Sequence, residues 1–199
     1  MKKFEITLLF LCGGKGLRAA GNDKPLLAFR GKTIIEHMLT ALAPAASEVL
    51  ISANRNLEQY QGFGYPVRED LAPFEGPLAA LASCAKVIST PWVMVCPGDN
   101  PLVQVELIDQ LVDTLLASLA NSEAVPDMLL VQDSVRVQPL YFLARTDCLP
   151  TMQQAMGERR AIMHWIDTLN VRRVFVGGDF PNINSLDDLK QLDRNLPGD

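Results

Sequence analysis

Short apolar runs alternate with amphipathic stretches along most of this chain. The runs Ile6–Leu11 and Trp92–Cys96 are bounded by Gly or Pro, which is typical of buried strands. Apolar residues at helical spacing over 34–42 predict a helix, and Thr33 with Glu36 predicts a capping box at its start. Because strands alternate with helices, the pattern predicts an α/β fold with a mainly parallel sheet flanked by helices.

The same periodicities predict the remaining elements of what we expect to be a single domain over residues 1–199. Expected strands lie at 48–52, 65–67, 128–132, 135–143 and 171–176; expected helices lie at 76–87, 105–120, 146–156 and 161–169, and a last helix starts after Ser185 as its N-cap. A tight turn at Asp133-Ser134 would join two of these strands into a hairpin and add at least one antiparallel strand. Pro139 indicates a sheet edge or a bulge there.

The first apolar run ends at two adjacent glycines, Gly13-Gly14, and Lys15, Arg18 and Lys24 follow closely. Glycines allow backbone N–H groups to converge on an anion, and flexible cations suit the phosphates of a nucleotide. The turn matches neither G-x-x-x-x-G-K-[ST] nor G-x-G-x-x-G. A glycine turn with solvated cations therefore remains an alternative interpretation.

The overall charge argues for a small phosphorylated ligand. The chain has 199 residues and a net charge of −5, so an extended nucleic-acid groove is not expected. No apolar run is long enough to span a membrane, and Glu5 interrupts the only stretch that looks like a secretion signal. The cysteines at 12, 84, 96 and 148 form no C-x-x-C pair, which argues against zinc and disulfides and favours the cytoplasm.

Polar side chains follow two of the expected strands. Ligands collect where parallel strands end, so Asn54, within Ser52–Asn56, is placed to hydrogen-bond a base or ribose. Asp99 follows the second apolar run, and its hard carboxylate oxygens suit Mg²⁺. An Asn-rich turn and a Pro-Gly-Asp-Asn-Pro turn are the structural alternatives for these two segments.

Several blocks together resemble molybdenum cofactor guanylyltransferases, the MobA type of nucleotidyltransferase. These blocks are Cys12–Arg18 with Gly21–Leu27, then Ser52–Asn56, Gly76–Ala79, Pro97–Pro101 and Asn182–Asn184. The first is shared with many sugar-nucleotide and cytidylyl transferases, whereas Ser-Ala-Asn-Arg-Asn discriminates better. The resemblance runs from about Leu8 to about Leu189. Departures from the usual pattern are Cys12 for Ala, Ala19-Ala20 for Met-Gly, and Gly98 for Cys.

The resemblance implies a Rossmann-like fold of the nucleotide-diphosphosugar transferase type. It implies transfer of GMP from GTP to the molybdenum-molybdopterin cofactor, with other cofactor-synthesis proteins and molybdoenzymes as further candidate partners. The implied nucleotide-binding residues are Leu11, Cys12, Gly13, Lys24, Asn54, Asp70 and Asp99, where Asp70 would accept the N1 and N2 protons of guanine. The implied catalytic residues are Arg18, Lys24 and Asp99, with Asp99 also holding Mg²⁺. Acceptor binding would involve Gln138, Asn182 and Asn184.

Two other functions fit the same motifs. One is a related cytidylyl or sugar-phosphate nucleotidyltransferase, which preference among GTP, CTP and UTP would separate. The other is a non-catalytic GTP-binding relative, for which Ala19, Ala20 and Gly98 are the supporting features. Such a relative would bind GTP but release no pyrophosphate.

Overall fold

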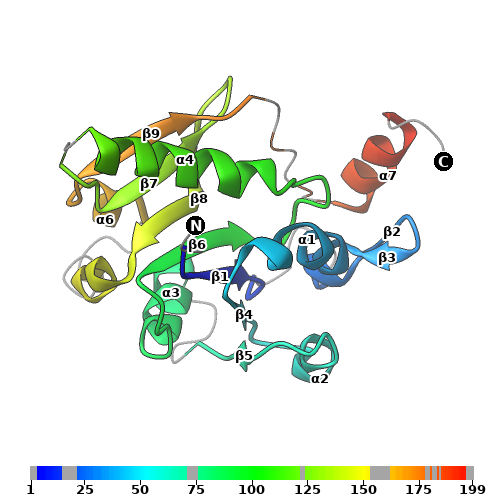
Figure 1. The fold of residues 1–199 in the computed structure, drawn as a ribbon. Helices are drawn as coiled ribbons and strands as arrows, with labels where there is room; N and C mark the ends of the chain where they lie inside the picture. The colour runs from blue at the N-terminus through cyan, green and yellow to red at the C-terminus, as the bar shows by residue number, and fades with distance from the viewer. Residues whose placement is uncertain are drawn as a thin grey trace.

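A seven-stranded sheet forms the centre of the described part of the chain (Figure 1). The computed structural model describes residues 4–14, 22–70, 76–121, 124–152, 162–177, 180, 183 and 185–195. The strand order is β5-β4-β1-β6-β8-β7-β9. The strands are β1 (Ile6–Leu11), β4 (Glu48–Ser52), β5 (Val67–Arg68), β6 (Trp92–Pro97), β7 (Met128–Gln132), β8 (Val137–Arg145) and β9 (Val171–Phe175). Only β8 runs antiparallel to its neighbours, so the predicted mainly parallel sheet with an antiparallel strand is confirmed.

Strand β1 lies between β4 and β6, and its side chains are buried on both faces of the sheet. Leu8 and Phe10 belong to one apolar cluster, and Leu9 belongs to the cluster on the opposite face. A parallel strand covered on both faces needs a nearly continuous apolar run, which is what residues 6–11 supply. The carboxyl end of β1 therefore lies near the middle of the row of strand ends where β4, β1 and β6 finish.

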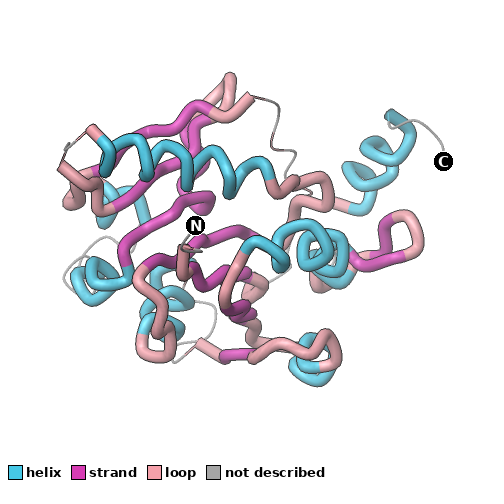
Figure 2. Tube along the Cα trace, in the orientation of Figure 1, coloured by secondary structure: helices cyan, strands magenta, loops and turns pink. Residues whose placement is uncertain are grey.

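Helices cover both faces (Figures 1 and 2). Residues of α1 and α4 pack in the cluster with Leu8 and Phe10, and residues of α3, η4 and α6 pack in the cluster with Leu9. The helices are α1 (Ile34–Leu42), α2 (Leu57–Gln61), α3 (Pro77–Ala85), α4 (Glu106–Ala120), α6 (Ile162–Ile166) and α7 (Leu186–Asn195), with 3₁₀ turns η2 (Lys24–Leu26), η3 (Ala43–Ala45) and η4 (Thr146–Thr151). In the described ranges, every helix is too short or too polar to cross a bilayer. A two-stranded ribbon, β2 (Ala28–Phe29) with β3 (Lys32–Thr33), precedes α1.

The two helix starts with a predicted N-cap, at Thr33 and Ser185, are confirmed by their capping bonds. At α1 the Glu36 amide donates to Thr33 Oγ1 at 3.3 Å, and the Thr33 amide donates back to Glu36 Oε2 at 2.7 Å. At α7 the Asp188 amide donates to Ser185 Oγ at 3.1 Å, and the Ser185 amide donates to Asp188 Oδ2 at 2.9 Å. Local sequence thus determines where these helices begin.

The hairpin region differs from the prediction in two respects. The connection is longer than Asp133-Ser134, because the Asp133 carboxylate accepts the amides of Val135 and Arg136 and delays β8 to Val137. Strand β8 lies between β6 and β7, so the prediction of a sheet edge at Pro139 is wrong. The register of β7 on β8 shifts between Leu130 and Gln132, so the pairing is irregular opposite Pro139, which is consistent with the alternative of a bulge. Pro139 also lies beyond the paired part of β6, where no ladder bond is needed.

Two smaller corrections concern short elements. Strand β5 comprises Val67–Arg68 instead of 65–67, and Pro66 instead contributes its carbonyl to the Ile51 amide. The stretch expected as a helix from 146 begins as the 3₁₀ turn η4, which contains Pro150. Because proline lacks an amide hydrogen, a regular α-helix is disfavoured there. The rest of that stretch, 153–160, lies outside the described residues.

Candidate functional site

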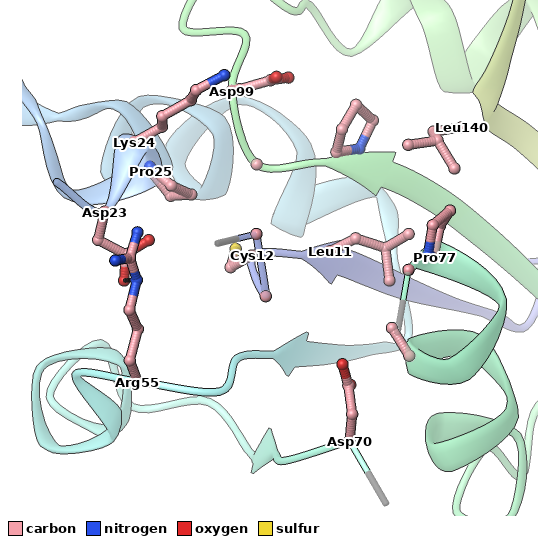
Figure 3. Close-up of a pocket in the computed structure, with 16 residues that line it drawn as sticks. Leu11, Cys12, Asp23, Lys24, Pro25, Arg55, Asp70, Pro77, Asp99 and Leu140 are labelled. Atoms are coloured by element: carbon pink, nitrogen blue, oxygen red, sulfur yellow. Dashed lines mark ion pairs between the residues drawn. The ribbon is translucent and has the colours of Figure 1, made fainter. Parts of the chain in front are cut away.

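A cavity of about 460 Å³ opens at the carboxyl edge of β1 and β6 (Figure 3). Its size falls in the range usual for small-molecule sites. It is lined by Leu11, Cys12, Gly13, Gly14, Asp23, Lys24, Pro25, Arg55, Asp70, Gly76, Pro77, Ala80, Pro97, Gly98, Asp99 and Leu140. Most of the nucleotide-binding residues expected from the sequence therefore meet in one place.

The glycine turn leaves the sheet at residue 13. The Gly98 amide donates to the Leu11 carbonyl at 3.0 Å, and the Cys12 amide donates to the Ser52 carbonyl at 2.7 Å. The Cys12 amide is thus committed to the protein in this arrangement, so Gly13 and Gly14 are the first residues past the sheet ladder. A Cβ on Gly13 would lie 2.6 Å from Asn54 Nδ2, which explains why glycine stands there. Arg18 lies outside the described residues.

Asn54 and Asp70 form a hydrogen-bonded unit at one side of the cavity. Asn54 Nδ2 donates to Asp70 Oδ2 at 2.7 Å, and the Asp70 amide donates to Asn54 Oδ1 at 2.9 Å. The Ser52 hydroxyl donates to the other Asp70 oxygen at 2.9 Å. Asp70 is buried, and these bonds fix its carboxylate, which keeps lone pairs for further donors. Asn54 therefore orients Asp70 and also contacts the Gly13 carbonyl at 3.4 Å.

Asp99 carries the unsatisfied acceptor of the site. Its Oδ1 atom is buried and has no hydrogen-bond partner among the described residues. Burial raises the pKa of this carboxyl, and the charge of nearby Lys24 acts in the opposite direction. The other carboxylates lining the cavity, Asp23 and Asp70, already accept hydrogen bonds from asparagine side chains. A cation beside Asp99 would satisfy its oxygen.

Lys24 lies next to Asp99 in the structure. Its 3₁₀ turn packs against the end of β6, where a Cβ built on Gly98 would be 3.1 Å from Pro25 Cγ. Figure 3 shows the Lys24 and Asp99 side chains at the same end of the cavity. A phosphate chain with a bound metal ion suits this end of the cavity, because the carboxylate can contact the metal and the ammonium can contact the phosphates.

Of the three residues expected to bind the acceptor, the structure describes only Gln138. Gln138 is buried and donates to Asp133 Oδ2 at 2.5 Å, so its side chain supports the loop before β8 and does not line the cavity. Asn182 and Asn184 lie outside the described residues. Ile183 donates its amide to the Asp99 carbonyl at 3.2 Å, so this residue lies directly beside Asp99.

Sequence reasoning missed Arg55, Asp23 and Pro25 as cavity residues. Arg55 belongs to the Ser-Ala-Asn-Arg-Asn block, and Asp23 and Pro25 flank Lys24. Their positions inside these motifs could have indicated that they line the cavity. Leu140 offered no such signal, because it reaches the cavity only through the placement of β8 beside β6.

Two departures from the usual family pattern contact each other. A Cβ on Gly98 would lie 2.6 Å from the sulfur of Cys12, so the thiol occupies the space that a side chain at 98 would need. The Cys12 thiol therefore leaves no room for a side chain at 98, so the residues at these two positions are sterically coupled. The thiol is buried, and burial raises its pKa, so it acts here as a small apolar group.

We expect Gly98→Ala to lower the thermal midpoint, because overpacking of this kind costs about 1–3 kcal/mol. Cys12→Ala removes the sulfur and should restore most of the loss in the double variant. Thermal unfolding of the wild type, both single variants and the double variant measures the coupling. Equal losses from Gly98→Ala with and without Cys12 would contradict the steric coupling.

Comparisons with known proteins identify the family and the fold. Residues 8–174 match the family described as the MobA-like NTP transferase domain. A molybdenum cofactor guanylyltransferase from Ralstonia nicotianae is 37% identical over 202 residues, covering 94% of this chain and 96% of that protein. A molybdopterin-guanine dinucleotide biosynthesis protein A from Archaeoglobus fulgidus has a TM-score of 0.70 at 21% identity, covering 94% and 97% of the two chains. A Mycobacterium tuberculosis protein solved as a manganese complex has a TM-score of 0.73 at 16% identity, covering 98% and 100%.

Proposed function

Because this chain belongs to the family of MobA-like NTP transferases, we propose that it transfers GMP from GTP to the molybdenum-molybdopterin cofactor. The products would be the guanine dinucleotide form of the cofactor and pyrophosphate. The observation that carries the proposal is a buried Asp99 oxygen with no hydrogen-bond partner among the described residues, close to Lys24 in a cavity at the glycine turn. This combination suits a nucleoside triphosphate with a divalent cation.

Mg²⁺ is the cation we assign to Asp99. In the described ranges no group of three or more His, Cys, Asp or Glu side chains is placed to share a metal. A single carboxylate fits Mg²⁺, which keeps several waters and takes further oxygens from substrate phosphates. When bound, the ion would neutralise charge on the triphosphate.

The proposed reaction depends on the positioning of its two substrates and needs no covalent intermediate with the protein. A phosphate oxygen of the acceptor attacks the α-phosphorus of GTP, the bond from that phosphorus to the bridging oxygen breaks, and pyrophosphate leaves with the electron pair. The acceptor phosphate is already ionised, so no general base is needed. Lys24 would neutralise the growing phosphate charge, while Gly13 and Gly14 would let the backbone approach the nucleotide. Arg18 remains an expected contributor.

The deciding experiment is an assay of pyrophosphate release with GTP, Mg²⁺ and the molybdenum-molybdopterin acceptor. We expect release only when all three are present. Release with CTP or UTP instead would favour a related cytidylyl or sugar-phosphate transferase. GTP binding without any release would favour a non-catalytic relative.

We expect the protein to prefer GTP over ATP through the fixed carboxylate of Asp70. Guanine offers N1 and N2 protons to a carboxylate, and adenine offers no such pair. Loss of a charged hydrogen bond should cost about 1.5–3 kcal/mol. Titrations of GTP, ITP and ATP measure the preference, with ITP as the matched ligand that lacks only the N2 amino group. Equal affinity for GTP and ATP would remove this role from Asp70.

The proposal also places the reaction in a reducing compartment such as the cytoplasm. The described cysteines 12, 84, 96 and 148 are all unpaired and buried, which supports that location. Delivery of the product to other cofactor-synthesis proteins or to molybdoenzymes is part of the same proposal.

A further inference from the structure

We infer that Asp23 is a positioning residue that holds Lys24 in its reactive place through a clamp between two loops. The clamp consists of Asp23 and Asn22 on one loop and of Arg55 and Asn56 on the other. This inference rests on the proposed function, since it concerns how Lys24 is presented to the nucleotide.

The side chains of Asp23 and Asn56 contact each other instead of capping their own helices. Asp23 stands at the N-cap of η2 and Asn56 at the N-cap of α2, yet neither makes a side-chain capping bond. Asn56 Nδ2 instead donates to Asp23 Oδ2 at 3.0 Å. Both side chains therefore form a contact between loops in place of a local capping bond.

Arg55 adds two further links to the same clamp. Its Nε lies 3.5 Å from Asp23 Oδ2, and its Nη2 donates to the Asn22 carbonyl at 2.8 Å. The Asp23 side chain is only 4% exposed, so its charge is buried beside the guanidinium. A buried carboxylate needs such partners, and together they fix the two residues that precede Lys24.

The second loop is itself firmly placed. Asn56 has a φ of 52°, in the left-handed region that asparagine adopts more readily than most non-glycine residues. Two residues earlier, Asn54 is bonded to Asp70 and to the Gly13 carbonyl. The short segment 54–56 therefore connects the glycine turn and Asp70 to the turn that carries Lys24.

This arrangement explains why Asp23 is buried at the cavity wall although it is no metal ligand in our assignment. The Lys24 ammonium must stay beside Asp99 to act on a phosphate, and a misplacement of 1 Å can cost about 100-fold in rate. Asn at position 23 would keep the size of the side chain and remove the charge that holds Arg55. The Lys24 turn would then lose the ion pair with the second loop and keep only the hydrogen bonds to it.

The test is a double-mutant cycle of Asp23→Asn with Lys24→Ala, read as kcat and KM for GTP and as thermal midpoints. We expect Asp23→Asn alone to lower kcat by about 10- to 100-fold. In the Lys24→Ala background the same change should lower kcat less than about twofold, because the group it positions is gone. Asn56→Ala, which leaves both charges in place, should reproduce a smaller version of the same pattern.

Asp193→Asn is the matched control. Asp193 also pairs with an arginine, Arg30, at 2.7 Å, but on an exposed surface that does not line the cavity. The kcat of the Asp193→Asn variant should equal that of the wild type. Equal losses from Asp23→Asn with and without Lys24, or losses that follow a lowered thermal midpoint, would overturn the inference. A wild type that releases no pyrophosphate would instead overturn the proposed function.

Discussion

Replacing Asp99 by asparagine is expected to abolish most Mg²⁺-dependent turnover, with a loss on the order of 100- to 1,000-fold in kcat. The buried Oδ1 atom has no partner in the described protein, so the carboxylate is available to a cation. Without that cation, the carboxylate and a triphosphate would repel each other. Asparagine keeps the size of the side chain but removes the negative charge that binds Mg²⁺. Steady-state rates across a Mg²⁺ titration measure the effect.

The same variant should leave the metal-free fold intact or slightly stabilised. Burial raises the pKa of Asp99, so the folded protein holds this proton more tightly than the unfolded chain does. The contribution of the group to stability is therefore fully present below the unfolded pKa and is lost as pH rises through the higher folded pKa. Above that folded pKa the charged carboxylate destabilises the fold, and Asp99→Asn removes that cost. Thermal midpoints measured against pH without metal check the sign.

Asp113→Asn provides a matched control, because Asp113 is exposed in the middle of α4 and away from the cavity. It should change neither the Mg²⁺ dependence nor the rate. Full Mg²⁺-dependent activity in Asp99→Asn would mean that the metal is held elsewhere. A strongly lowered thermal midpoint in the same variant would make Asp99 a structural turn residue.

The parts of the fold that depend on local pattern could be predicted from the sequence. The apolar runs at β1 and β6 place two neighbouring strands, and their glycine and proline boundaries place the cavity at the ends of these strands. Thr33 with Glu36 and Ser185 with Asp188 mark the helix starts, since capping involves residues only three positions apart.

The parts that depend on distant contacts could not be predicted. Nothing in the periodicity of β8 says that it lies between β6 and β7, so Pro139 was interpretable as an edge residue. The carboxamide of Gln138 reads as a ligand group in the sequence, whereas in the fold it is buried against Asp133. The contact between Asp23 and Asn56 joins residues 33 positions apart and becomes visible only when the loops are in place.

Lys24 is the second residue whose loss should have a large effect. We expect Lys24→Ala to lower kcat on the order of 100- to 1,000-fold at saturating GTP, while the fold survives. The apolar anchors of its turn remain, because Pro25 is buried and Leu26 packs against the core. A fixed ammonium stabilises phosphate most as charge develops on the leaving pyrophosphate, so kcat should fall more than GTP affinity does.

Lys24→Ala should also change the pH dependence of the residual activity. The charge of Lys24 lowers the pKa of Asp99, whereas burial raises it. Removal of the ammonium therefore raises that pKa further, and the acidic limb of the rate profile should move to higher pH, since Asp99 must be ionised to bind the cation. Lys32→Ala, which removes an exposed lysine on β3, should leave both the rate and the pH profile unchanged. Near wild-type turnover of Lys24→Ala at saturating GTP would show that another cation neutralises the phosphates. An acidic limb that stays at the same pH would show that the charge of Lys24 does not affect the ionisation of Asp99.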